Sequence, residues 1–284
     1  MTVSIVTDST SDLPRELAQR HRIEVVPLTV AFGAEQYRDG IDITPDEFYP
    51  RLSSGGVLPT TSQPPPALFQ YVYTHLASRG DVVSVHLSHK LSGTVETARN
   101  AARAVAPARI SVVDTGSTSM GVGLCALAAA RAAERGASRD ECAAAAASVA
   151  RRLHVAVALD TLEYLRRGGR LGRAQSFLGG LLRLKPVLTV NDGEVAPLAR
   201  ARSRQKAIDE LYALLGRVDS VEEAVVLHST TPDDAAALAE RVRAALPGVP
   251  LHTGRFGPVL GVYGGPGMLG IAVVGRHGAG GEPA

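Results

Sequence analysis

The sequence predicts an α/β protein with a parallel β-sheet in its N-terminal part and a second α/β domain after it. Short apolar runs alternate with longer segments whose apolar residues recur every three or four positions. This alternation is typical of a parallel sheet that helices cover on both faces. Beyond residue 154 an Asn191-Asp192-Gly193 turn separates two strand-like runs and predicts a hairpin. We therefore expect domains at 1–154 and 155–276, and a flexible tail at 277–284.

Strands and helices alternate along the N-terminal half. Pro14 suits the first turn of a helix that Asp12 can cap. Residues 23–32 predict a strand pair or one strand broken at Pro27, and residues 33–66 predict an irregular segment with one short helix. The remaining expected strands are 3–7, 82–87 and 110–114, and the remaining expected helices are 67–79, 94–105, 121–135 and 139–153.

The C-terminal half has a different order of expected strands and helices. A short helix at 162–168 is expected to end at a double glycine, and an apolar segment follows at 174–184. The expected strands are 155–159, 186–190, 194–199, 223–228, 251–255 and 271–274, and the expected longer helices are 203–218 and 232–246.

The composition argues against several classes of function. The 30 basic and 28 acidic residues nearly balance, so there is no electrostatic case for binding nucleic acid. Aromatic residues make up 4% and tryptophan is absent, which argues against a stacking surface for single strands. Cys125 and Cys142 lie in Ala-rich helical patterns and are expected to be reduced core thiols of a cytoplasmic protein.

A first candidate anion site lies where the expected strand 82–87 leads into the helix that begins at Thr94. Ser88, Ser92 and Gly93 stand between them. The free N–H groups and positive dipole end of a helix N-terminus suit an anion. Ser92 could also be a nucleophile, although the G-x-S-x-G pattern is not met around it. N-capping, anion binding and catalysis all stay open for this residue.

A second candidate is the loop that contains Thr60, Thr61, Ser62 and Gln63, which prolines stiffen on both sides. Three hydroxyls and an amide held in this way suit a carboxylate or a phosphate. A turn with local hydroxyl bonds explains them equally well.

Other patterns carry weaker hypotheses. The glycines of 265–270 have the spacing of a dinucleotide fingerprint, but a strand follows them, so a structural turn is favoured. His86 and His89 could form a metal pair, yet no third ligand accompanies them, and we expect neither a metal nor a cofactor. The arginines at 166, 167, 170, 200, 202 and 204 could form a basic face.

Taken together, several motifs resemble the DegV family over nearly the whole chain. They are Asp8-Ser9-Thr10-Ser11-Asp12-Leu13, Pro59-Thr60-Thr61-Ser62-Gln63-Pro64, Leu91-Ser92-Gly93-Thr94, Arg166-Arg167-Gly168-Gly169-Arg170, Leu184-Lys185-Pro186 and the segments 114–123 and 257–270. The resemblance implies a two-domain DegV-like fold that encloses a long-chain fatty acid between its domains. It also implies a carrier without enzymatic activity, which presents the acyl carboxylate to a separate fatty acid kinase subunit in phospholipid metabolism. We expect a monomer with transient membrane contact.

The resemblance also assigns residues. It implies a carboxylate site made of Thr61, Ser62, Ser92, Gly93, Thr94 and Tyr263. Tyr263 stands where the family usually has a histidine, so it can donate a hydrogen bond but carries no positive charge near neutral pH. Arg170 and Arg202 match basic positions that the family uses toward the kinase.

Two other functions stay open beside the fatty-acid carrier: a serine hydrolase, and a protein that binds some other small anion and regulates a partner. The acyl tunnel is expected to include Phe177, Leu178, Leu181 and Leu182, which ordinary core packing explains equally well. The rival function is a serine hydrolase of acyl esters with Ser92 as nucleophile. That mechanism requires a histidine within hydrogen-bond reach of Ser92, and His86 and His89 are the nearest in sequence.

Overall fold

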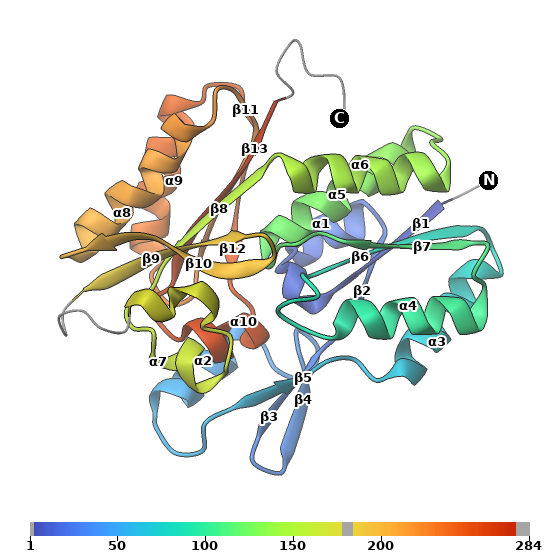
Figure 1. The fold of residues 1–284 in the computed structure, drawn as a ribbon, viewed down its shortest axis with the longest axis horizontal. Helices are drawn as coiled ribbons and strands as arrows, with labels where there is room; N and C mark the ends of the chain where they lie inside the picture. The colour runs from blue at the N-terminus through green and yellow to red at the C-terminus, as the bar shows by residue number, and fades with distance from the viewer. Residues whose placement is uncertain (1–2, 178–183, 277–284) are drawn as a thin grey trace.

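The computed structural model describes residues 3–177 and 184–276, which form three β-sheets and the helices packed on them (Figure 1). The predicted tail at 277–284 lies outside the described residues. The predicted α/β class is confirmed, because a four-stranded parallel sheet is joined to a second, six-stranded sheet. No helix of the described ranges is long and apolar enough to cross a membrane.

The first sheet is entirely parallel. Its strands follow the order β2-β1-β6-β7 and comprise β1 (Val3–Asp8), β2 (Ile23–Val26), β6 (Asp81–His86) and β7 (Ile110–Asp114). Alternate residues of the central strands point to opposite faces. Val6 and Val82 pack with α3 (Pro66–Ala77) and α4 (Thr94–Val105). Ile5 and Val83 pack with α5 (Met120–Glu134) and α6 (Arg139–Arg151). Helices on both faces explain the continuous apolar runs of these strands.

The second sheet has six strands. Their order is β10-β9-β8-β13-β11-β12, with β8 (Leu153–Ala158), β9 (Lys185–Asn191), β10 (Glu194–Ala201), β11 (Val221–His228), β12 (Leu251–Arg255) and β13 (Leu269–Gly275). Only β11 and β12 pair in parallel; the other neighbouring strands described here are antiparallel. One face is covered by α8 (Arg204–Ala213) and α9 (Pro232–Ala245).

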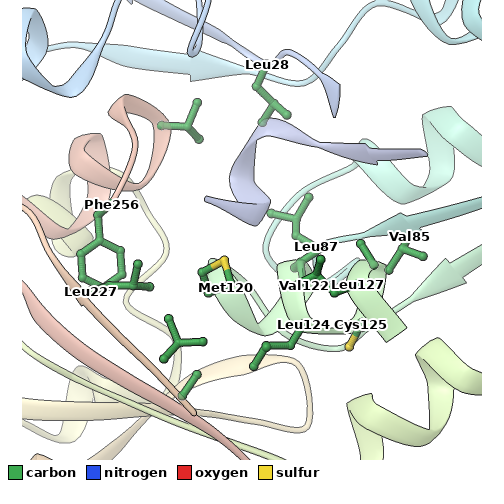
Figure 2. Packing of buried hydrophobic residues seen from close by; sticks show 14 of the residues in the cluster. Leu28, Val85, Leu87, Met120, Val122, Leu124, Cys125, Leu127, Leu227 and Phe256 are labelled. Carbon is green, nitrogen blue, oxygen red and sulfur yellow. The ribbon is translucent and has the colours of Figure 1, made fainter. Parts of the chain in front are cut away.

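The other face of this second sheet turns toward α5 of the N-terminal half. Figure 2 shows Met120 of α5 facing Leu227 and Phe256, which are buried in the same core cluster. That cluster also contains Val85 of the parallel sheet, so one continuous core joins both sheets through α5. The chain enters the second sheet at Leu153, and the predicted domain boundary at residue 154 stays a prediction.

The expectation of an irregular segment at 33–66 is wrong in part. Two strands in it, β4 (Glu35–Arg38) and β5 (Thr60–Ser62), pair antiparallel with β3 (Thr29–Phe32) in the order β4-β3-β5. The segment 23–32 therefore splits at Pro27, and its two strands enter different sheets. Both missed strands are short and polar, so no apolar alternation marks them in the sequence. The short helix expected in this segment is α2 (Pro45–Ser53).

Shorter helical elements complete the fold. They are η1 (Ser9–Ser11), α1 (Arg15–Arg20), α7 (Glu163–Arg167), η2 (Gly172–Phe177), η3 (Leu214–Arg217) and α10 (Pro258–Gly264). The helix expected at 203–218 is thus divided into α8 and η3, and α10 was not predicted. Gly265 and Gly267 have φ values of 75° and 79° in the turn from α10 into β13, so the glycine-rich segment is a structural turn.

Candidate functional site

A pocket of about 320 Å³ with both polar and apolar walls lies where β5, the loop before α4 and α10 meet, and is called the polar pocket here for its hydroxyl groups. Five of the six residues predicted for the carboxylate site line it, namely Thr61, Ser62, Ser92, Gly93 and Tyr263. Arg170 lines it as well. The two loops that the sequence marked as separate anion sites therefore form one pocket.

Thr61 and Tyr263 close one side of this pocket. Their hydroxyl oxygens lie 2.5 Å apart and form a hydrogen bond. Thr61 is held by its strand β5, in which it pairs with Val30 of β3. Tyr263 belongs to the last turn of α10, and its ring packs on Gly168, where an added Cβ would lie 2.4 Å from the ring. The Arg170 guanidinium lies 5.3 Å from the centre of the same ring.

Ser92 and Gly93 form another part of the pocket wall. The Ser92 hydroxyl lies 2.9 Å from that of Thr94 and accepts a weak hydrogen bond from the Thr94 N–H at 3.3 Å. Thr94 is buried at the first turn of α4 and does not line the pocket, so it orients Ser92. An added Cβ on Gly93 would lie 2.3 Å from Oε1 of Gln63, which shows how closely the two loops approach. The Gln63 amide also donates to Thr97 of α4 at 2.7 Å.

The structure gives no support to a hydrolase at Ser92. His86 is buried, with Nδ1 2.8 Å from Asp8 and Nε2 2.7 Å from Ser84. His89 is exposed and bonds to Asp114 at 2.6 Å. Neither histidine bonds to Ser92 within the described part of the chain, and their separate partners also argue against a shared metal.

The Ser84-His86-Asp8 chain of hydrogen bonds resembles a catalytic triad in its connectivity. All three side chains are fully buried, and the Tyr73 hydroxyl donates to Ser84 at 2.8 Å. A substrate cannot reach the Ser84 hydroxyl in this arrangement. These residues therefore tie β1, β6 and α3 together as a buried polar network.

A second, apolar cavity of about 110 Å³ lies directly behind the polar pocket. The two share Thr118, Leu165, Val195, Leu260 and Tyr263 as wall residues. The cavity lies between the start of α5, α10 and the face of β8, β9 and β13 that turns toward the N-terminal half. Its deeper walls include Val155, Val157, Leu159, Leu188, Leu227, Phe256, Met268 and Ile271. An apolar cavity and a pocket lined by hydroxyls thus lie next to each other.

Comparison with known proteins places the chain in a family. The model of the DegV family, described as uncharacterised proteins, matches residues 2–276. The chain belongs to the DegV family. A DegV domain-containing protein of Streptomyces coelicolor is 42% identical over 279 residues, which cover 96% of this chain and 99% of that protein.

Solved DegV structures have the same fold. A fatty-acid-binding DegV family protein from Thermus thermophilus superposes with a TM-score of 0.91 at 41% identity, covering 97% of this chain and all of the other. DegV from Bacillus subtilis, a fatty acid binding protein, gives a TM-score of 0.89 at 34% identity with the same coverage. The predicted DegV-like fold is confirmed over nearly the full length.

The tunnel residues expected for this DegV protein stay a prediction, because only the first of them lies in the described part of the chain. Phe177 packs against Arg200, whose guanidinium lies 4.5 Å from its ring centre, and it is not among the cavity walls. Leu178, Leu181 and Leu182 lie outside the described residues. The walls that the second sheet gives to the cavity come from β8, β9, β11 and β13. They were missed because apolar residues face both sides of this sheet, so the pattern does not reveal which face is hollow.

The two arginines expected to face a kinase differ in position. Arg170 is exposed at the mouth of the polar pocket, where its Nε and Nη1 donate to the carbonyls of Leu91 at 3.2 Å and Gly168 at 2.8 Å. Arg202 is exposed just after β10 and does not line the pocket. Of these two arginines, Arg170 borders the polar pocket and Arg202 does not.

Proposed function

We propose that this DegV protein binds a long-chain fatty acid, with the acyl chain in the apolar cavity and along the apolar walls of the polar pocket, and the carboxylate at the hydroxyls of that pocket. The observation that carries the proposal is that these two spaces are adjacent and have five wall residues in common, as a ligand with an apolar chain and a polar head requires. The fatty-acid-binding relatives from Thermus thermophilus and Bacillus subtilis support the same class of ligand.

The pocket offers neutral donors to a carboxylate. The Ser92 hydroxyl can donate, and one hydroxyl of the bonded pair Thr61 and Tyr263 keeps a free hydrogen. The N–H of Gly93 lies at the start of α4, where the helix dipole favours an anion. Hydrogen bonds to a charged acceptor contribute about 1.5–3 kcal/mol each. Such a site orients the carboxylate without a direct ion pair, which keeps one of its oxygens available for reaction.

The acyl chain supplies most of the binding energy. Each methylene removed from water contributes about 0.8 kcal/mol, so about 14 methylenes give a gross gain of about 11 kcal/mol. Lost translational freedom and ordering of the chain offset a large part of this gain. We therefore expect tight binding that still allows exchange.

We further propose that the protein acts as a carrier in the cytoplasm, and that a separate fatty acid kinase phosphorylates the bound carboxylate. The position of Arg170 supports this role. Arg170 donates hydrogen bonds to backbone carbonyls, and no carboxylate of the described residues pairs with it. A cation at the pocket mouth suits a phosphorylated ligand or an acidic surface of a partner.

Ligand identity is tested by mass spectrometry of an organic extract from the purified, folded protein. A stoichiometric long-chain fatty acid is the expected result, and folded protein that neither carries nor takes up such an acid would contradict the proposal. The carrier role is tested by adding ATP and a bacterial fatty acid kinase to the loaded protein. Acyl phosphate should form only when both proteins are present, and its formation by this chain alone would contradict the non-enzymatic role.

A further inference from the structure

We infer that Asp12 is a positioning residue for the ligand site, because it fixes the starts of the two helices that form its walls. This inference rests on the proposed fatty-acid binding. Asp12 belongs to the first motif of the chain, which is remote in sequence from Thr61, Ser92 and Tyr263. Among the described residues, it forms no hydrogen bond with any of these three.

The two carboxyl oxygens of Asp12 bind two different segments. Oδ1 accepts the N–H of Gly257 at 2.8 Å, and Oδ2 accepts the hydroxyl of Ser119 at 2.5 Å. These partners lie 245 and 107 residues away in the sequence. Gly257 is the N-cap of α10 and Ser119 is the N-cap of α5. One side chain after β1 therefore joins the starts of two helices from different parts of the chain.

Both helix starts lead directly into the ligand site. Ser119 and Met120 line the apolar cavity at the beginning of α5, while Leu260 and Tyr263 of α10 line both the cavity and the polar pocket. A shift of either helix start would move the wall against which a ligand packs. A displacement of α10 would also separate the Tyr263 hydroxyl from Thr61.

The position of α10 depends on such contacts. It has only seven residues, and helices of that length are unstable without tertiary packing. Pro258 has no N–H, and the N–H groups on either side of it, at Gly257 and Val259, are bound by Asp12 and Asp39. The free donors at the start of this helix are thus satisfied by carboxyl groups from distant segments.

The backbone at these contacts is held in costly conformations. Asp12 has φ of 48° and Ser119 has φ of 54°, both in the left-handed region that non-glycine residues rarely adopt. Such a conformation persists only where surrounding contacts hold it. Burial raises the pKa of Asp12 well above its usual value, while hydrogen bonds from Ser119 and Gly257 oppose that rise. Asparagine keeps the shape of this side chain and an acceptor for the Gly257 N–H, and its amide can donate to the Ser119 hydroxyl oxygen.

The experiment compares Asp12→Ala, Asp12→Asn and the exposed control Asp219→Ala by hydrogen exchange and by fatty-acid dissociation. In ligand-free protein, Asp12→Ala should raise exchange of peptides covering 257–264 at least tenfold, and Asp12→Asn should restore most of the protection. With bound fatty acid, Asp12→Ala should speed dissociation about tenfold. Unchanged exchange and dissociation in Asp12→Ala would overturn the inference.

A double-mutant cycle separates positioning from general loss of stability. If Asp12 acts through Tyr263, Asp12→Ala should weaken binding less in a Tyr263→Phe background than in the wild type. Fully additive losses would overturn the inference.

Gly257→Ala offers a second route if Asp12→Ala does not fold. Its φ of −68° accepts alanine, but the new Cβ would lie 3.0 Å from Asp12 Oδ1 and displace the carboxyl group. Gly257→Ala should reproduce the faster hydrogen exchange and the faster fatty-acid dissociation expected of Asp12→Ala. Wild-type rates of both would count against the inference. Hydrogen exchange needs no ligand, so absence of fatty acid in the wild type would contradict the proposed function alone.

Discussion

The phenolic oxygen of Tyr263 lies 2.5 Å from the hydroxyl oxygen of Thr61, although 202 residues separate them in the sequence. This bond joins α10 to the small antiparallel sheet and closes one side of the polar pocket. Tyr263 stands where the resemblance led us to expect a histidine, and it still reaches the threonine hydroxyl. The pocket therefore keeps a donor at this position without a titratable imidazole.

Tyr263→Phe should weaken fatty-acid binding about tenfold, because a hydrogen bond to a charged or hydroxyl partner is worth about 1.5 kcal/mol. Titration calorimetry with a long-chain acid measures the change. Tyr71→Phe is the matched control, since Tyr71 is 74% exposed on α3. Equal affinities for wild type and Tyr263→Phe would show that this hydroxyl does not contact the carboxylate.

Ser92→Ala should also weaken binding about tenfold, because it removes a donor to the carboxylate and leaves Thr94 without its partner. The measurement is the same titration, with Ser78→Ala as a control on the exposed end of α3. Wild type and Ser92→Ala should both fail to hydrolyse acyl esters. Esterase activity that disappears in Ser92→Ala would revive the hydrolase hypothesis.

Val157→Phe should reduce binding of long acids more than that of short acids. Val157 lines the apolar cavity from β8, and a larger ring there would occupy space that the chain needs. Competition with acids of increasing length measures the effect. Val57→Phe is the control, since Val57 is 64% exposed in a loop. A uniform loss at every chain length would place the acyl chain elsewhere.

Asp39 should make stability depend on pH. Burial raises its pKa from 3.8 to about 7, opposed by hydrogen bonds from Ser9 and Val259, and nearby Asp8 raises it further. Between these values the folded state holds a proton that the unfolded state has lost. The free energy of unfolding should therefore fall as the pH rises from about 4 to about 7, and this contribution should level off above that.

Asp39→Asn should remove this contribution to the pH dependence. Chemical denaturation at several pH values between 4 and 8 measures it as the difference between wild type and variant, which cancels most contributions from other titrating groups. Asp219→Asn is the exposed control. Parallel pH profiles for wild type and Asp39→Asn would show that Asp39 titrates normally.

Arg131→Met should destabilise the protein by about 2 kcal/mol, because it leaves the Glu223 carboxylate without its arginine partner. The guanidinium of Arg131 on α5 donates to both oxygens of Glu223 on β11, at 2.7 and 2.8 Å. Burial acts to raise the pKa of Glu223, but hydrogen bonds from His252 and Arg131 lower it to about 2. The contribution of the Glu223 carboxylate to the free energy of unfolding should be lost as the pH falls below about 4.

Denaturant unfolding of wild type and variant measures this loss. Arg99→Met is the control, because Arg99 pairs with Glu96 on the exposed surface of a single helix and should change stability by about 0.5 kcal/mol or less. Equal losses in the free energy of unfolding for the two variants would show that the contact between α5 and β11 contributes no more than an exposed ion pair.

Much of the fold could be predicted from local patterns. Apolar runs marked β1, β6 and β7, and the Asn191-Asp192-Gly193 turn marked the hairpin of β9 and β10. The strands β4 and β5 could not be predicted, because they are short and polar and pair with a strand that only the folded chain brings near. The helix α10 was missed because glycine and proline frame it, and the helix is held by contacts from outside.

The sequence by itself determined the alternation of strands and helices, the family, and two loops suited to an anion. Hydrophobic periodicity and local hydroxyl chemistry are properties of neighbouring residues, so they can be read along the chain. Only the tertiary structure decided that these loops share one pocket, that Tyr263 forms a hydrogen bond with Thr61, and that the apolar cavity lies next to them. Those relationships join residues far apart in sequence, and packing alone decides which apolar face of a sheet is filled and which encloses space.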